Sequence, residues 1–132
     1  MIELGILKSK FKIEMADWIF NKNGRATLIY DNDCLRNDHG QVIAWIYNYS
    51  FFSLKGKHKG WVEEGIFYDS NNSIIGFLSS YTGHLPSIPD TSGKPGMPGF
   101  AGRPGRSGFI GVPGRPGFEG WSTSNFEDYF NE

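Results

Sequence analysis

Apolar and polar positions along residues 17–80 form a pattern that recurs every 16 residues without insertion. Each unit has an apolar run, a polar turn and a second apolar run. The turns end at glycine-type residues, and a large apolar side chain follows each of these five positions later. The two sets are Gly24, Gly40, Gly56 and Asn72, and Ile29, Trp45, Trp61 and Phe77. Such a repeat is one supersecondary element copied four times.

The apolar runs of each unit predict strands, because they are short and rich in aromatic and branched residues. Asn-Gly and Asn-Asn pairs between them tolerate the positive φ of tight hairpin turns. A single 16-residue hairpin is marginally stable, so four must share a core. The sequence therefore predicts an all-β fold with four β-hairpin repeats around a pseudo-fourfold axis. The predicted units are 17–32, 33–48, 49–64 and 65–80.

Small residues recur four positions after three of the turn residues, at Ala44, Gly60 and Gly76, whereas the first unit has Leu28. Their recurrence indicates that strands approach one another closely near the axis. We expect the larger residues that follow them to fill the space between neighbouring hairpins; these are Trp45, Trp61 and Phe77.

Glycine occupies every third position from residue 93 to residue 120, and five of these triplets end in proline. This composition is typical of a polyproline II strand and, in three copies, of a collagen-like triple helix. The proline-containing residues 81–92 form the predicted linker between the repeats and this tail. After the tail, residues 121–132 form an aromatic and acidic C-terminal segment that we expect to dock onto a neighbour or the β-domain.

Two arrangements of the tail are open. Three tails can wind into a triple helix, which makes the protein a trimer. Alternatively, each tail folds back on its own or a neighbouring β-domain, and we favour this second arrangement. Its candidate docking residues are Phe100, Phe109, Phe118 and Trp121, because the three phenylalanines are nine residues apart and fall on one side of a helix of period three.

The N-terminal extension, residues 1–16, lies outside the repeat, and Met15 is a second candidate start just before it. We expect either an upstream extension or an added element that covers an edge of the sheet. The N-terminus lacks a secretory pattern and no apolar run has the length of a membrane span, so we expect a cytoplasmic protein.

The formal net charge of −1 gives no general reason to expect nucleic acid or a membrane as a partner. Lys55, Lys57 and Lys59 alternate beside Trp61, which suits either a phosphate-binding face or a solvated edge strand, and we favour the edge strand. Cys34 is the single cysteine, so it forms no intrachain disulfide and is expected to be a small buried side chain.

The segment from Ala16 to Phe77 resembles the four-fold β-flower family of small bacterial proteins. The residues that carry the resemblance include 19–24, 36–40, 43–46, 60–63 and 68–77. The resemblance implies four hairpins set like petals, often followed by a proline-rich tail with a three-residue period. It implies no activity and no catalytic residues.

His58 is the best single candidate for a functional site, because its unit-equivalent positions hold the apolar residues Ala26, Val42 and Ile74. A small-ligand or peptide pocket near the axis would use His58, Trp45, Trp61 and Phe77. The spacing of the histidines, carboxylates and Cys34 predicts no metal site, no cofactor and no nucleophilic triad.

We therefore expect a non-enzymatic structural or interaction module whose tail mediates assembly or packs on the β-domain. Its expected partner is another copy of itself or an unknown protein. The alternative is a small-ligand or peptide-binding domain with its pocket near the pseudo-fourfold axis. An enzyme is the third class, and the sequence offers no constellation of residues for it.

Overall fold

The computed structural model describes residues 16–131 of the chain. The N-terminal extension predicted over residues 1–16, and with it the alternative start at Met15, lies outside the described residues except for Ala16.

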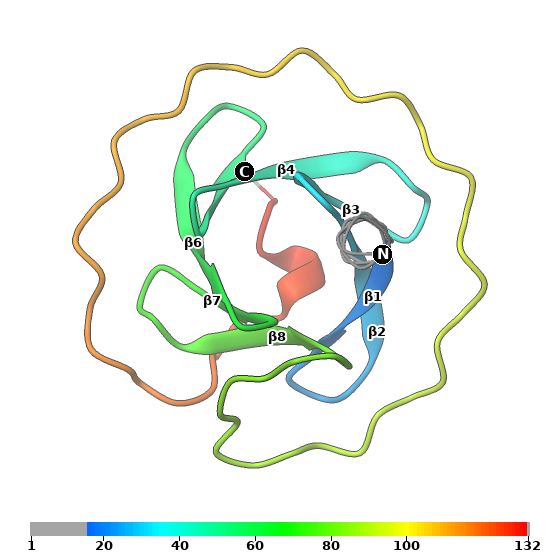
Figure 1. Cartoon of the computed structure of the whole chain (residues 1–132), viewed down its shortest axis with the longest axis vertical. Coiled ribbons are helices and arrows are strands. Elements are labelled where there is room, and N and C mark those ends of the chain that lie inside the picture. Colours follow the sequence, from blue (N-terminus) through cyan, green and yellow to red (C-terminus); the bar gives the residue numbers. More distant parts are fainter. Residues whose placement is uncertain (1–15, 132) are drawn as a thin grey trace, which may run out of the picture.

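Eight antiparallel strands close into one barrel, and each strand pairs with the next along the chain until β8 pairs with β1 (Figure 1). The prediction of an all-β fold with four hairpin repeats is confirmed, because each 16-residue unit forms two neighbouring strands. The strands are β1 Asp17–Asn21, β2 Ala26–Asp31, β3 Cys34–Arg36, β4 Val42–Tyr47, β5 Ser50–Ser53, β6 His58–Glu63, β7 Ile66–Tyr68 and β8 Ile74–Leu78.

The glycine-type residues have the same role in all four hairpins. Each has a positive φ, and its amide donates a hydrogen bond to the carbonyl three residues earlier, as from Gly40 to Asn37 at 3.0 Å. The connections between hairpins are also tight. The third hairpin, for example, starts from Asn48 and Tyr49, which both have positive φ, as the mirror-image turns of β-hairpins require.

A β-bulge recurs at the same place in every hairpin. In the first hairpin Ile19 pairs with Leu28 and Phe20 pairs with Ala26, so Thr27 is the extra residue. The small residues that follow the bulge make room for aromatic rings inside the barrel. A Cβ at Gly60 would lie 2.6 Å from the Phe51 ring, and one at Gly76 would lie 2.6 Å from the ring of Phe126.

The buried apolar residues form two layers, so the four hairpins share an inner core and also bury apolar side chains on their outer face. The inner layer fills the barrel and includes Phe51, Phe67 and Phe126. The outer layer lies on the outside of the barrel wall and includes Trp45 and Phe77. Alternation along each strand separates the two layers, because successive side chains point to opposite faces.

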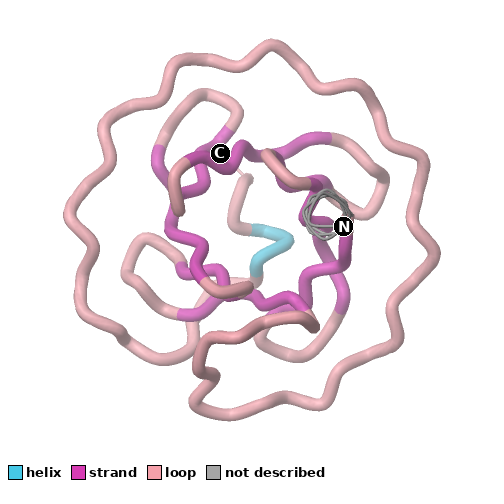
Figure 2. The backbone as a smooth tube through the Cα atoms, viewed as in Figure 1, coloured by secondary structure: helices cyan, strands magenta, loops and turns pink. Residues whose placement is uncertain are grey.

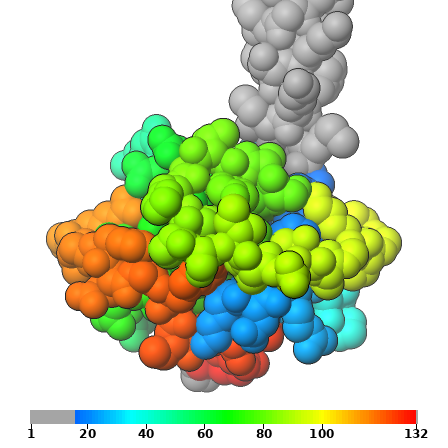
Figure 3. All heavy atoms as spheres, turned by 90° about the horizontal axis from the view of Figure 1, so that it is seen from below, coloured from blue at the N-terminus to red at the C-terminus, as the bar shows by residue number. Residues whose placement is uncertain are grey.

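The tail, residues 93–120, carries no helix or strand and runs around the outside of the barrel as an extended chain (Figures 1 and 2). In the side view, its yellow and orange segments lie along the outer surface (Figure 3). The chain then turns inward, and the short 3-10 helix η1, Phe126–Asp128, lies in the centre of the ring of strands (Figure 2). The outer layer is thus enclosed between the barrel and the segments that follow β8.

Among the described residues, no helix has the length and hydrophobicity needed to cross a lipid bilayer.

Candidate functional site

The tail is attached to the hairpin turns by a regular set of backbone hydrogen bonds. The amides of Ser92, Ala101 and Ile110 donate to the carbonyls of the first three turn glycines, at 2.7, 3.1 and 2.8 Å. These acceptors are Gly24, Gly40 and Gly56. Donors nine residues apart therefore meet acceptors 16 residues apart, so that one nine-residue stretch of tail spans one hairpin.

Gly40 shows why glycine is needed at these attachment points. Its φ is +82°, which L side chains rarely adopt, and a Cβ there would overlap the carbonyl of Gly99. The tail glycines differ: only Gly120 among them has a positive φ, and none of them has a close neighbour. A Cβ at Gly102, and at each other glycine from 93 to 120, meets no atom within 4 Å.

Planar side chains strengthen the attachment between the strands and the tail. In the second hairpin the guanidinium of Arg36 lies 4.4 Å from the ring centroid of Phe100. In the third, the rings of Phe52 and Phe109 stack at 4.0 Å with an interplanar angle of 9°. These contacts join equivalent positions, because Arg36 and Phe52 are 16 residues apart and Phe100 and Phe109 are nine apart.

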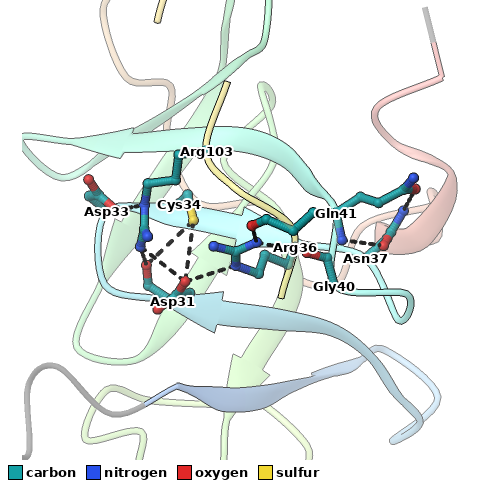
Figure 4. A network of polar contacts seen from close by, with 9 residues as sticks. Asp31, Asp33, Cys34, Arg36, Asn37, Gly40, Gln41 and Arg103 are labelled. Carbon is teal, nitrogen blue, oxygen red and sulfur yellow. Dashed lines mark hydrogen bonds and ion pairs between the residues drawn. The ribbon is translucent and has the colours of Figure 1, made fainter. Parts of the chain in front are cut away.

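A buried polar network centred on Arg36 joins the second hairpin to the tail (Figure 4). The Arg36 side chain is 2% exposed, and its Nε donates to Oδ2 of Asp31 at 2.8 Å. Its Nη1 donates to the carbonyls of Gly40 and Ala101, both at 2.7 Å. From the tail, Arg103 pairs with the same carboxylate at 3.0 Å. The Asp31 carboxylate therefore pairs with Arg36 of a strand and with Arg103 of the tail.

Cys34 lies beside this network, and its thiol donates to the Asp31 carbonyl at 3.5 Å. Burial raises the pKa of the Cys34 thiol to about 11, so the thiol is protonated at neutral pH. The expectation of a small buried side chain is confirmed, since Cys34 is fully buried.

His58 is enclosed by aromatic rings on the outer face of the barrel. Its ring centroid lies 4.7 Å from that of Trp61 and 5.4 Å from that of Phe52. Its Nε2 lies 3.1 Å from the Ser50 hydroxyl, whereas its buried Nδ1 has no partner among the described residues. Burial lowers the pKa of His58, so the ring is neutral at pH 7.

The C-terminal segment closes the centre of the barrel. Phe126 is fully buried, and its ring centroid lies 5.5 Å from that of Phe67 and 5.8 Å from that of Phe51. Trp121 forms an isolated bridge with Ile74, and the Tyr129 hydroxyl donates to the Lys59 carbonyl at 2.6 Å. The segment thus docks onto the β-domain of its own chain.

The structure does not bring the four predicted pocket residues together at the pseudo-fourfold axis, because the inner-layer rings occupy the centre of the barrel. His58 pairs with Phe52, whose ring contacts the tail outside the barrel, and paired residues point to the same face. The other three pocket residues also lie on the outer face, under the tail, the linker or a neighbouring hairpin; they are Trp45, Trp61 and Phe77.

The four residues predicted to dock the tail have different surroundings. Phe109 stacks on Phe52, and Phe100 accepts the Arg36 guanidinium over its ring. Trp121 contacts Phe77 with their ring centroids 6.1 Å apart. Phe118 is 53% exposed and contacts no other ring or cation within the described part of the chain.

Sequence reasoning missed the tail residues whose amides attach to the turns. A partial signal was present for two of them. The third residue of a triplet is proline at five places, but it is Ala101 and Ile110 where an amide donates to a turn glycine. Proline has no amide hydrogen and could not make this bond. Ser107 and Glu119 also lack proline at the third position and make no such bond, so the missing prolines alone do not identify the attachment points.

The cavities of the structure lie at the surface. One of about 250 Å³ lies between the linker and the tail beside Tyr68, and another of about 490 Å³ lies against Lys55, Lys57 and Lys59. Within residues 16–131, no group of three or more His, Cys, Asp or Glu side chains is placed to hold a metal ion.

A comparison with curated proteins finds no match, and neither does a comparison with solved structures. The family model described as "4-fold beta flower protein" matches residues 17–130, a range that includes all eight strands, the tail and η1. The match confirms the resemblance seen in the hairpins, and the chain therefore belongs to the 4-fold β-flower protein family.

Proposed function

We propose that this protein is a non-enzymatic structural and interaction module. Its barrel is a rigid support, and its tail is a belt that wraps its own barrel and presents an outer surface to a second copy or to another protein. The proposal rests on one observation: tail residues nine apart bond to hairpin turn residues 16 apart, so that the repeat of the tail matches the repeat of the barrel.

The length of the tail supports this proposal. An extended chain of period three rises about 3.1 Å per residue, so nine residues span about 28 Å and the three such stretches of the tail about 84 Å. Nine residues of extended tail reach from one turn glycine to the next, and the tail amides bond in turn to Gly24, Gly40 and Gly56. A tail with this spacing suits wrapping a fourfold barrel, whereas a triple helix needs only the glycine period.

The chemistry of the two most reactive side chains favours a non-enzymatic role. The Cys34 thiol is protonated at neutral pH because burial raises its pKa to about 11, and a thiol in that state is a poor nucleophile. The imidazole of His58 contacts a serine hydroxyl and two aromatic rings, and among residues 16–131 no carboxylate accepts a hydrogen bond from it.

The outer surface offers apolar side chains to a protein partner. Tyr47 ends the second hairpin, Tyr49 begins the third, and Val112 lies in the stretch of tail that follows the attachment of the third hairpin; each is more than half exposed. The corresponding positions to Tyr49 and Val112 in the second hairpin hold Asp33 and Arg103, which form an ion pair at 3.0 Å. The third hairpin therefore replaces an ion pair by exposed apolar groups, a composition suited to a protein contact.

Residue-resolved hydrogen exchange on the full chain, combined with light scattering, tests the wrapped tail. We expect slow exchange at the amides of Ser92, Ala101 and Ile110 and fast exchange at Gly102 and Gly105. We expect a mass of one or two chains and no collagen-type circular dichroism. A threefold mass with protection at every tail glycine is the result of a triple helix, and it would refute the proposal.

A further inference from the structure

The four hairpins are not equally filled where the tail crosses them. In the second and third hairpins, a planar group from the strand covers a tail phenylalanine: Arg36 covers Phe100, and Phe52 covers Phe109. The equivalent tail residue of the fourth hairpin is Phe118. No ring or cation of the described residues covers it, and 53% of its surface is exposed.

The strand residue that would cover Phe118 is Tyr68, and it is engaged elsewhere. The guanidinium of Arg115 lies 4.7 Å from the Tyr68 ring centroid. Arg115 is itself fixed, because its Nε donates to Asn72 Oδ1 at 2.7 Å and its Nη1 pairs with Glu63 at 3.0 Å. The phenylalanine therefore borders a hollow of about 250 Å³, with Tyr68 and Arg115 also in its lining.

The hollow carries an unbalanced negative charge. Glu64 lines it, and no described residue forms an ion pair or side-chain hydrogen bond with the Glu64 carboxylate. The charge of Arg115 is balanced by Glu63. A cation that enters the hollow thus meets one available carboxylate and the exposed ring of Phe118.

The second hairpin shows which cation this combination of groups holds. There, a guanidinium lies over the ring of Phe100 while Asp31 accepts a hydrogen bond from it at 2.8 Å. A guanidinium suits both contacts, because it is flat enough to stack on a ring and its N–H groups point at a carboxylate in its plane. An ammonium group carries the same charge, but it is not planar and does not stack on a ring in this way.

We propose that the hollow beside Phe118 binds the guanidinium group of an arginine side chain from a partner polypeptide. The guanidinium stacks on Phe118 and donates to the Glu64 carboxylate, and so reproduces with a second molecule the contact that Arg36 makes within the chain. This assignment goes beyond a structural role, because it identifies the chemistry that a partner must present.

Titration of the full-length protein with three capped tripeptides, followed by amide chemical shifts, tests the site. The peptides are Gly-Arg-Gly, Gly-Lys-Gly and Gly-citrulline-Gly, which separate a planar cation from a non-planar cation and from a planar neutral group. We expect saturable shifts at Gly83 and Phe118 with the arginine peptide, and binding about fivefold weaker with each of the others. Equal binding of the citrulline or the lysine peptide overturns the assignment.

Two variants locate the interaction. Glu64→Gln removes the charge and Phe118→Leu removes the aromatic face, and each is expected to weaken binding of the arginine peptide about fivefold. Asp38→Asn and Ile88→Ala are the matched controls, because they change an exposed carboxylate and an exposed apolar side chain elsewhere. Unchanged melting temperatures show that both test variants fold. Undiminished binding by them would refute the proposal.

Discussion

Replacing Phe126 by alanine tests whether the C-terminal segment is part of the core. The side chain is fully buried, and it packs against the rings of Phe51, Phe67 and Phe130 at centroid distances of 5.5–5.8 Å. Phenylalanine-to-alanine changes at such sites cost about 3–5 kcal/mol, from lost burial and from the cavity that remains. Since domains are stable by about 5–15 kcal/mol, this one substitution removes a large part of the total.

The environment of Gly76 supplies a second, independent measure of the same packing. A methyl group at this position would lie 2.6 Å from Cδ2 of Phe126 and 3.0 Å from Cγ2 of Ile19. Gly76→Ala is therefore destabilising in the natural chain and less so when residue 126 is alanine, because the methyl group then enters the cavity. We expect the two free-energy changes to differ by about 1 kcal/mol or more.

Urea unfolding followed by tryptophan fluorescence gives the free energies of the four proteins in this cycle. Phe118→Ala is the matched control, since it removes an exposed ring and is expected to change stability by less than about 0.5 kcal/mol. A cost below about 1 kcal/mol for Phe126→Ala, or the same cost for Gly76→Ala in both backgrounds, would show that the segment does not fill the barrel.

Three further predictions concern the tail and the buried titratable groups. Gly40→Ala is expected to lower the free energy of unfolding in urea by about 1–3 kcal/mol, because Gly40 has a positive φ and a Cβ there overlaps the tail. Gly102→Ala is the control and changes stability little, because its Cβ meets open space. Similar costs at both sites contradict this prediction. The Cys34 thiol, whose pKa burial raises to about 11, is expected to react with a disulfide reagent at pH 8 at least about tenfold more slowly than a peptide thiol, and a rate equal to that of the peptide contradicts its burial. Burial lowers the pKa of His58 below its ordinary value of 6.5, so the unfolded chain takes up a proton at a higher pH than the folded chain does. The free energy of unfolding is therefore expected to fall as the pH drops below 6.5. His58→Gln should reduce this pH dependence, and an unchanged dependence contradicts the role of His58.

The hairpins were predictable because the residues within each hairpin determine its geometry. The turn residues need positive φ, and the flanking runs have strand-forming side chains; both are properties of short segments. The repeat then fixed the number of hairpins. The closed barrel follows from the equivalence of the four hairpins. Each hairpin pairs with the next in the same way, and the last closes the ring when β8 pairs with β1.

The location of the tryptophans was not predictable, since a large apolar side chain suits either face of a barrel wall. Trp45 and Trp61 are buried because other segments cover the outside of the barrel, and that covering depends on contacts more than 40 residues apart in sequence. The bulge at each hairpin adds to the difficulty. It shifts the alternation by one residue, so that neighbouring residues such as Thr27 and Leu28 interrupt a simple inward and outward pattern.

The position of Phe126 after the belt in the sequence has a consequence for synthesis. All eight strands leave the ribosome before the residue that fills their centre, and the whole belt must be made first. A nascent barrel therefore lacks this interior ring until the belt itself has been synthesised. The core of the barrel is thus completed only after the chain that wraps it, although the core lies inside.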